Sequence, residues 1–521
     1  MKNRKFEIIA SIVIILVITS VMCIYQTKKE GFHEDEVYSF ASAVNPTDGL
    51  MVAYDTENIT EESKPEWKTR ESVKDYMTLK KENYLNLKSI YTNQKKDNHP
   101  PFFYLLVHFS SILFNGNFSK YPIFLINIVV FILSCIIIIK MLKILKKEYL
   151  SIGVIILYGL SMGTISMVLY QRMYMVLTMF MLLYLYYNIK IYINNFEIDK
   201  KTYVKLGIIT VLGFLTQYFF AIFAVFVFIL MTIEMLREKK YKIFRNYLIF
   251  HIVYAIIGVL TFIPCLRHLF YTDRGISNLK NGLYLEHLST YIKHLLYSFT
   301  IKDNLILDIS ILVAIAIGVL YSIIKKRNRF IILITLIPSL MFFLITVKMT
   351  SYQEIRYIMP IIPFLCIMFF AILDSVIQIK NREYIFIAIA LIISINGLIN
   401  SKPKFLFEEY KECLDIANSN KEKSFVYVYD NMFNHMQSVP EMMIYKKTLI
   451  LNVTKNELEY LINDENLKQE EAYILAIKTY MDNEKILKEI TSKTEFKNIT
   501  KLYEPGSSTE KISNILYLVS K

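Results

Sequence analysis

Long apolar runs recur along the first 400 residues, and most have the length that crosses a lipid bilayer as a helix. A backbone inside hydrocarbon must satisfy its own hydrogen bonds, which a helix does within one segment. The pattern predicts a mainly α-helical, polytopic membrane bundle of about eleven transmembrane helices. The runs lie at about 7–25, 121–140, 151–168, 173–191, 203–217, 219–236, 246–265, 305–324, 329–347, 357–378 and 384–400.

Basic residues gather in short connections between these runs. Such clusters mark cytoplasmic loops, so the net charge of +13 reflects orientation in a membrane and argues against nucleic-acid binding. With the basic N-terminus also inside, the first long loop and the C-terminal region are expected outside. The clusters are Lys143, Lys146 and Lys147; Arg237, Lys239, Lys240, Lys242 and Arg245; Lys325, Lys326, Arg327 and Arg329; and Lys380 and Arg382.

Two extramembrane regions complete the expected organisation. A transmembrane domain over residues 1–401 contains a large first external loop at 26–120, and a separate external domain covers 402–521. The latter alternates strand-like and helical segments, which is typical of a small α/β domain. Within the loop, the apolar stretch Phe102–Phe114 is too short to cross and favours a helix along the outer membrane surface. The strand-like segments are Ser424–Tyr429, Lys447–Asn452, Glu471–Ile477 and Ile512–Val519.

Three consecutive carboxylates, Glu34, Asp35 and Glu36, follow the first apolar run. Adjacent acids repel one another, so a fold that keeps them together uses them for a cation or for proton transfer. A solvated loop after a membrane anchor is the simpler explanation of an acidic triplet. Cations on the same side of the membrane favour a functional site instead. They are His99, Lys120, Arg172, Arg267, His268 and Arg356.

Carboxylates and cations at a membrane surface suit a reaction on an amphiphile with an anionic head. In a polyprenyl-phosphate sugar, the tail needs lipid and the phosphate needs Arg or Lys. Sugar transfer requires a base to deprotonate the acceptor hydroxyl, whereas phosphate is already a good leaving group whose charge needs cations. One carboxylate with arginines meets this requirement, while a hydrolase of an ordinary glycoside uses a paired acid and base.

Four short motifs follow one another over about residues 5–400. They are Asp35-Glu36, His99-Pro100-Pro101, Arg172-Met173-Tyr174 and Arg356-Tyr357 with Pro360. In this order they resemble the motifs of GT-C class membrane glycosyltransferases. The resemblance is to the superfamily of dolichyl-phosphate-mannose protein mannosyltransferases and bacterial aminoarabinose transferases, which is glycosyltransferase family 39-like.

This resemblance implies transfer of a sugar from a polyprenyl-phosphate donor to an external acceptor, with Asp35 as general base. It implies Arg172 and Arg356 as ligands of the donor phosphate, with Lys120 where the family tends to have arginine. Glu36 either orients Asp35, binds the acceptor or holds a metal. Further site candidates are His99, Tyr174, Tyr357, Arg267 and His268.

No cofactor is implied with certainty. The cysteines form no CxxC pair or Cys/His cluster of zinc-binding spacing. A divalent metal held by His268 together with Glu36 stays open. The expected partners are the lipid-linked donor, the external acceptor and the bilayer itself.

A transporter or lipid flippase is the main alternative. Carriers place charges at mid-membrane, whereas these apolar runs are nearly free of charge, with Glu234 and Asp374 close to cytoplasmic ends. A non-catalytic wall-assembly protein acting through residues 402–521 is a third possibility, which the acid pair argues against. We expect a multi-pass protein of a bacterial plasma membrane with an outward-facing active site.

Overall fold

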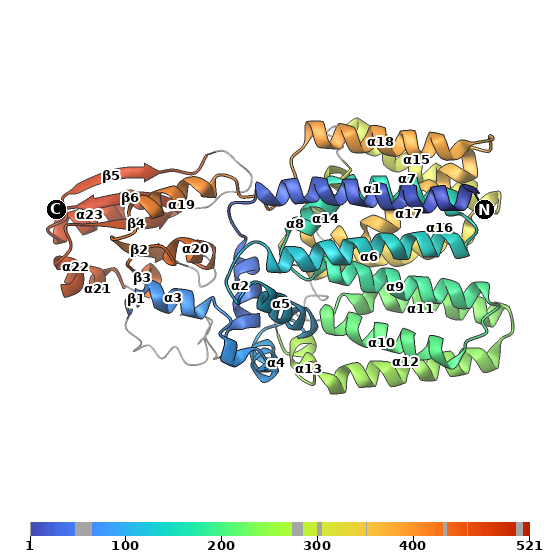
Figure 1. Ribbon diagram of the computed structural model, residues 1–521, viewed down its shortest axis with the longest axis horizontal. Helices are drawn as coiled ribbons and strands as arrows, with labels where there is room; N and C mark the ends of the chain where they lie inside the picture. The colour runs from blue at the N-terminus through green and yellow to red at the C-terminus, as the bar shows by residue number, and fades with distance from the viewer. Residues whose placement is uncertain are drawn as a thin grey trace. The chain divides into compact units, whose positions relative to one another are not determined.

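The computed structural model describes residues 2–46, 65–272, 285–299, 305–350, 352–430, 435–455, 457–506 and 514–521. Contacts divide the chain into two units (Figure 1). The membrane unit comprises Met1–Ile24, Gln94–Phe103 and Phe124–Lys404. The sheet unit comprises Tyr25–Asn93, Tyr104–Ile123 and Phe405–Lys521.

Helices make up the regular structure of the membrane unit. They are α1 (Lys2–Thr27), α6 (Pro122–Ile144), α7 (Ser151–Leu160), α8 (Met162–Leu169), α9 (Tyr174–Ile193), α10 (Lys200–Thr216), α11 (Phe220–Arg237), α12 (Tyr241–Thr261), α13 (Cys265–Phe270), α14 (Leu285–Ser298), α15 (Leu305–Ile324), α16 (Arg329–Met349), α17 (Ile362–Val376) and α18 (Arg382–Asn400). Short 3-10 turns are η2 (Glu148–Leu150), η4 (Ile355–Tyr357) and η5 (Met359–Ile361).

Every predicted apolar run is mainly helical, and one of them is bent sharply at a break. The run at 151–168 forms α7 and α8, which meet at an angle of 59°. Ser161 lies between them, and its hydroxyl accepts a hydrogen bond from the Thr164 N–H at 3.2 Å. This N-cap satisfies a backbone donor at the start of α8, so the chain begins a new helix in a new direction.

The protein is an integral multi-pass membrane protein with a helical bundle. Among the described residues, eight helices are long and apolar enough to cross a membrane, or nine if the bent pair counts as one span. α10 has 17 residues, and the part of α15 over Ile309–Ile324 is also shorter. The mainly helical class is confirmed, while the figure of about eleven crossings stays a prediction.

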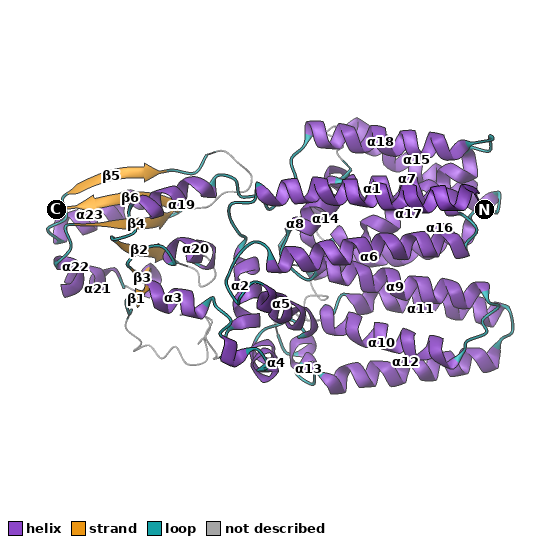
Figure 2. Cartoon of the chain, in the orientation of Figure 1, coloured by secondary structure: helices purple, strands orange, loops and turns teal. Residues whose placement is uncertain are grey.

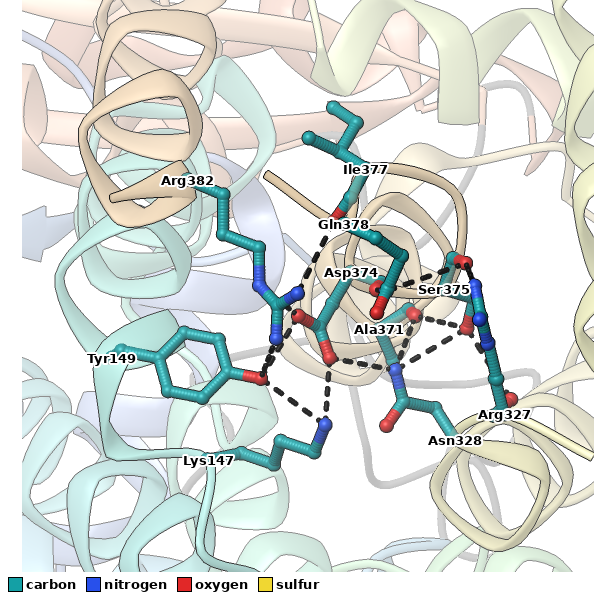
Figure 3. Close-up of polar contacts among 10 residues, drawn as sticks. All are labelled: Lys147, Tyr149, Arg327, Asn328, Ala371, Asp374, Ser375, Ile377, Gln378 and Arg382. Carbon is teal, nitrogen blue, oxygen red and sulfur yellow. Dashed lines mark hydrogen bonds and ion pairs between the residues drawn. The ribbon is translucent and has the colours of Figure 1, made fainter. Parts of the chain in front are cut away.

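Asp374 in α17 ties three helix connections of the membrane unit together (Figure 3). Its carboxylate pairs with Lys147 at 2.7 Å and with Arg382 at 2.8 Å. It also accepts hydrogen bonds from Tyr149 at 2.8 Å and Asn328 at 2.9 Å. A buried carboxylate is tolerated when cations and donors surround it in this way. Lys147 and Arg382, two members of the basic clusters, therefore fix helix ends.

All strands of the described chain belong to the sheet unit (Figure 2). They form one sheet of six strands in the order β1-β3-β2-β4-β6-β5, in which β2 is parallel to β3 and β4 and the outer pairings are antiparallel. The strands are β1 (Lys68–Thr69), β2 (Ser424–Tyr429), β3 (Lys447–Asn452), β4 (Ala472–Lys478), β5 (Asn498–Tyr503) and β6 (Asn514–Ser520).

The central strands of this sheet are buried along their length, which indicates that both faces are covered. Val426, Leu475 and neighbours on one face pack with Leu461 and Ile490 of nearby helices. The helices that the sheet unit contains in whole or in part are α2 (Glu34–Val44), α3 (Arg70–Tyr76), α4 (Leu87–Lys96), α5 (Phe102–Leu113), α19 (Tyr410–Ser419), α20 (Val439–Met442), α21 (Leu458–Asn463), α22 (Glu465–Lys468) and α23 (Asn483–Lys493).

The four predicted strands are present, and two more join them. β2 and β3 have the predicted bounds, β4 is shifted by about one residue, and residues 512–513 before β6 lie outside the described chain. β5 is only partly buried, and its sequence has no continuous apolar pattern. β1 comes from the first external loop and pairs Lys68 with Thr448. That loop and the C-terminal region thus share one sheet, whereas the predicted domain boundary at 401/402 stays a prediction for truncation to test.

Candidate active site

The acidic triplet forms the first turn of α2 in the sheet unit. His33 is the N-cap, and its Nδ1 accepts a hydrogen bond from the Asp35 N–H at 3.1 Å. In return the Glu36 carboxylate accepts from the His33 N–H at 2.7 Å. This reciprocal capping box satisfies two backbone donors, and acidic side chains in the first turn are stabilised by the helix dipole. The three carboxylates therefore stand at a helix start.

Glu36 is paired with Lys29 inside the sheet unit. The two side chains are completely buried, and Lys29 Nζ lies 3.0 and 3.1 Å from the two carboxylate oxygens. Lys29 also donates to the Phe405 carbonyl at 2.6 Å and lies 5.4 Å from the centre of the Phe407 ring. A buried charge needs this degree of compensation. The arrangement assigns Glu36 a structural task, and its catalytic role stays a prediction.

The segment that receives Lys29 has an unusual backbone. Phe405 and Phe407 both have positive φ angles, 71° and 49°, which are uncommon for bulky side chains. The Glu30 N–H donates to the Leu406 carbonyl at 2.9 Å. A Cβ on Gly31 would come within 2.8 Å of Phe407 and Tyr410 side-chain atoms. Close packing therefore holds the approach to α2 against the start of the C-terminal region.

Asp35 differs from its neighbour because 31% of its side chain is exposed. Its carboxylate lies 3.6 Å from Nδ1 of His33. α2 also contacts the C-terminal part of the sheet unit at η6 (Met436–Ser438). Burial lowers the pKa of Lys478 in β4 to about 8, and the charge of Glu34 in α2 acts in the opposite direction. The C-terminal region thus helps to position the helix that carries Asp35.

Lys120 closes the end of α1 in the same unit. Its ammonium donates to the carbonyls of Thr27, at 3.0 Å, and Lys29, at 2.5 Å. Cations near a helix C-terminus complement the dipole and the unsatisfied carbonyls there. Phosphate binding by Lys120 stays a prediction, and these contacts give the side chain a structural role.

Arg172 lies in the membrane unit, between α8 and α9, and only 3% of its surface is exposed. Its guanidinium contacts Nε2 of His99 at 3.1 Å, and Nδ1 of His99 lies 2.9 Å from the Asp97 carboxylate. Burial raises the pKa of Asp97, but charge and hydrogen bonding with His99, helped by Arg172, lower it to about 2. Two predicted residues and one unpredicted acid therefore form a connected polar chain.

Arg356, which precedes α17, contacts the same connection between α8 and α9. Its guanidinium donates to the Tyr170 hydroxyl at 2.7 Å and lies 5.1 Å from the ring centre of Tyr357. Tyr170 in turn stacks on Tyr174 with ring centres 5.9 Å apart, and Tyr174 meets the edge of Tyr357. Aromatic faces accept a guanidinium and limit its contact with water. The predicted residues Arg356, Tyr174 and Tyr357 are thus brought together.

A buried amide holds this segment in place. Asn127 of α6 donates to the carbonyls of Val168 and Tyr170, both at 3.0 Å. These carbonyls belong to the end of α8, where no helical partner remains. The Arg172 N–H completes the turn by donating to the Tyr170 carbonyl at 2.8 Å. Two arginines distant in sequence are therefore placed around one fixed connection at the start of α9.

His268 in α13 lies near the same polar chain. Its Nδ1 is 2.8 Å from the Tyr218 hydroxyl, and burial lowers its pKa although the Lys95 carbonyl and Asp97 act in the opposite direction. Arg267 beside it is exposed. Among the described residues, no group of three or more His, Cys, Asp and Glu side chains could hold a metal. Glu36 and His268 belong to different units, and a shared metal stays a prediction.

Sequence reasoning missed three participants. Lys29 was hidden in the basic stretch after α1, and a buried lysine has no sequence signature. Asp97 precedes the predicted His99 by two residues, a spacing that could have suggested their pairing. Tyr170 lies two residues before the predicted Arg172, and its hydroxyl accepts a hydrogen bond from Arg356.

The comparisons with known proteins concern the fold. No family model and no curated protein matches the sequence. ArnT from Cupriavidus metallidurans bound to undecaprenyl phosphate is 10% identical, with a TM-score of 0.55 over 97% of both chains. This chain has the ArnT fold. The apo state of ArnT gives a TM-score of 0.50 at 9% identity, again over 97% of both chains. The likeness extends over the helical bundle and the sheet unit alike.

Proposed function

We propose that this protein is a membrane glycosyltransferase that moves a sugar from a polyprenyl-phosphate donor to an extracytoplasmic acceptor. The observation that carries the proposal is that two buried arginines are held by the same connection before α9. The Arg172 backbone N–H donates to the Tyr170 carbonyl, and the Arg356 guanidinium donates to the Tyr170 hydroxyl. Buried arginines at the mouth of apolar helices are costly unless they face a polar cavity or a bound anion. The ArnT fold, solved in one case with undecaprenyl phosphate, supports the same class of donor.

The residues around Arg172 suit it to exchange partners when a phosphate binds. An arginine N–H always donates, so the contact with His99 requires an unprotonated Nε2 and places the ring proton on Nδ1, toward Asp97. A phosphate oxygen that accepts from the guanidinium would replace His99 Nε2 as its partner, and the Arg172 charge would then stand beside the leaving group.

Asp35 is the proposed general base. Its partly exposed carboxylate, in the first turn of α2, is favoured in the ionised form by the helix N-terminus, while Lys29 neutralises the neighbouring Glu36. The acceptor hydroxyl gives its proton to Asp35 as its oxygen attacks the anomeric carbon. The carbon–phosphate oxygen bond breaks, and its electron pair leaves with the polyprenyl phosphate.

The decisive experiment separates chemistry from donor binding. Asp35→Asn preserves shape and removes basicity, so we expect turnover with a synthetic lipid-phosphate sugar to fall about 10²–10⁴-fold while donor affinity changes little. Asp415→Asn, an exposed acid of α19, is the matched control and should leave turnover unchanged. Wild-type turnover by Asp35→Asn would contradict the mechanism and favour a carrier.

Substitution of the two arginines should instead weaken donor binding. Arg172→Ala and Arg356→Ala are each expected to weaken donor binding by about 1.5–3 kcal/mol, the value of a charge-assisted hydrogen bond. Binding is measured with the purified protein and a lipid phosphate that carries no sugar. Unchanged affinity in both variants would remove these residues from the donor site.

A further inference from the structure

A cleft of about 430 Å³ opens among α9, α11 and α16 in the membrane unit. Tyr192 lines it, whereas Tyr174 of the candidate active site stands on the same helix 18 residues earlier. At 1.5 Å per residue the two positions are about 27 Å apart, close to the thickness of a bilayer core. The cleft therefore belongs to the opposite membrane surface, where the basic clusters lie.

The charges in the cleft are mostly positive. Arg237, Lys326 and Arg329 contribute three cations, and Glu234 is the one acid of the lining, paired with Arg237 at 2.7 Å. Lys326 and Arg329 are exposed and make no ion pair within the described part of the chain. The cleft thus holds an excess of positive charge that an anion can neutralise.

The start of α16 adds to this preference. Asn328 precedes the helix with φ 51°, and its side chain does not cap the first turn. Its amide donates instead to Asp374, Ser375 and the Ala371 carbonyl, as Figure 3 shows. The first N–H groups of α16 therefore receive no side-chain cap at the cleft, and helix N-termini attract anions.

The remaining walls are apolar and continue onto the lipid-facing surface. Tyr192 and Phe330 stack with ring centres 3.7 Å apart and planes 8° apart, which joins α9 to α16. Ile233 lines the cleft and is 53% exposed, and Ile229, one turn earlier on α11, is 41% exposed. Exposed apolar residues that lead into a basic cleft suit an amphiphile better than a soluble anion.

We propose that this cleft binds the phosphate headgroup of an anionic phospholipid of the adjacent leaflet. The phosphate lies between Lys326, Arg329 and the start of α16, and the acyl chains follow α11 past Ile233. Glu234 accepts from a hydroxyl of the headgroup while it holds Arg237 in place. The site is independent of the proposed transferase reaction, because it lies at the other membrane surface.

Native mass spectrometry of the full-length protein in detergent tests the site with phosphatidylglycerol as the probe. In K326Q/R329Q, affinity for this lipid should fall about 25-fold, about fivefold for each lost cation. K325Q/K380Q removes the same charge from exposed positions outside the cleft and should change affinity less than about twofold. The melting temperature without added lipid establishes that both proteins are folded.

Two further measurements decide the chemistry of the ligand. Phosphatidylcholine, which carries no net charge, should bind at least about tenfold more weakly than phosphatidylglycerol. Millimolar inorganic phosphate should not displace the lipid, since it lacks the acyl chains. Equal affinity of wild type and K326Q/R329Q, or displacement by phosphate, would overturn the proposal.

Discussion

Two buried carboxylates of this protein, Glu36 in the sheet unit and Asp374 in the membrane unit, are each held by a lysine. Lys29 lies 3.0 Å from Glu36, and Lys147 lies 2.7 Å from Asp374. The Asp374 carboxylate also contacts a second cation, Arg382, and accepts hydrogen bonds from two neutral donors, so its charge is compensated. Both acids stabilise the ends of helices, since removal of one partner from a buried pair leaves an uncompensated charge.

The difference lies in the neighbouring residue. Next to Asp374 stands Ser375, whose hydroxyl is bonded to backbone carbonyls. Next to Glu36 stands Asp35, with 31% of its side chain exposed. The buried acid of α2 secures the helix, whereas its neighbour keeps a partly exposed carboxylate, as the proposed general base requires.

The largest effect is expected where the pair that secures α2 is broken. Lys29→Met leaves Glu36 buried without its cation, at a cost of about 3–5 kcal/mol in the free energy of unfolding. Because α2 carries Asp35, the proposed transferase activity should fall with it. Thermal unfolding and turnover of the purified protein measure the two effects.

The control is Lys28→Met at the exposed neighbouring position, which should alter neither quantity. The double variant K29M/E36L replaces the ion pair by apolar side chains and should regain most of the stability, apart from about 1 kcal/mol for the lost capping bond. A double variant as unstable as Lys29→Met would show that the pair is not what secures α2.

Asp374→Asn should separate stability from activity. It weakens charged hydrogen bonds to Lys147 and Arg382, and we expect a loss of about 1.5–3 kcal/mol in stability. Turnover per folded molecule should be unchanged, because the network around Asp374 connects only the ends of helices. The amount of folded protein and the turnover are measured in the same preparation. A loss of turnover per folded molecule would give Asp374 a role beyond structure.

A third buried acid, Glu441, sharpens the comparison because no ion pair to it is formed within the described chain. Burial raises its pKa to about 8, although Tyr410, Lys478 and Cys413 act in the opposite direction. Between an unfolded value of 4.5 and about 8, the folded state keeps a proton that the unfolded state has lost. Its contribution to stability therefore falls as pH rises, by up to about 1.4 kcal/mol per pH unit.

Glu441→Gln removes this dependence. The melting temperature of the variant should exceed that of the wild type at pH 8, and the difference should narrow toward pH 5. Glu471→Gln, at an exposed position before β4, is the control and should follow the wild type at both pH values. Parallel curves for Glu441→Gln and wild type would mean that Glu441 is ionised in the fold.

The smallest effect is expected at the N-cap of α2. His33→Ala removes the side-chain acceptor for the Asp35 N–H and should cost about 1 kcal/mol, whereas His33→Asn retains an acceptor and should cost less. Amide hydrogen exchange of Asp35 reports the local opening. Equal exchange in the two variants would show that the imidazole cap does not hold the start of α2.

The sequence by itself determined the helices and the central strands. Apolar runs predict helices wherever lipid removes water from the backbone, and all eleven runs are mainly helical. Alternation and β-branched residues likewise located β2 and β3 to the residue. Motif order brought out Arg172, Arg356 and His99, because side chains so costly beside lipid are conspicuous in an apolar sequence.

Only the tertiary structure decided which charges meet. Lys29 and Glu36 are separated by 7 residues, yet their pairing depends on the carbonyl of Phe405, 376 positions away from Lys29. Tyr170 and Arg356 meet across 186 positions. β1 joins the sheet with only two residues, which is too short a segment to show a sequence pattern. Local sequence records whether a side chain prefers water or lipid, whereas the partner of a buried charge is chosen by packing between distant segments.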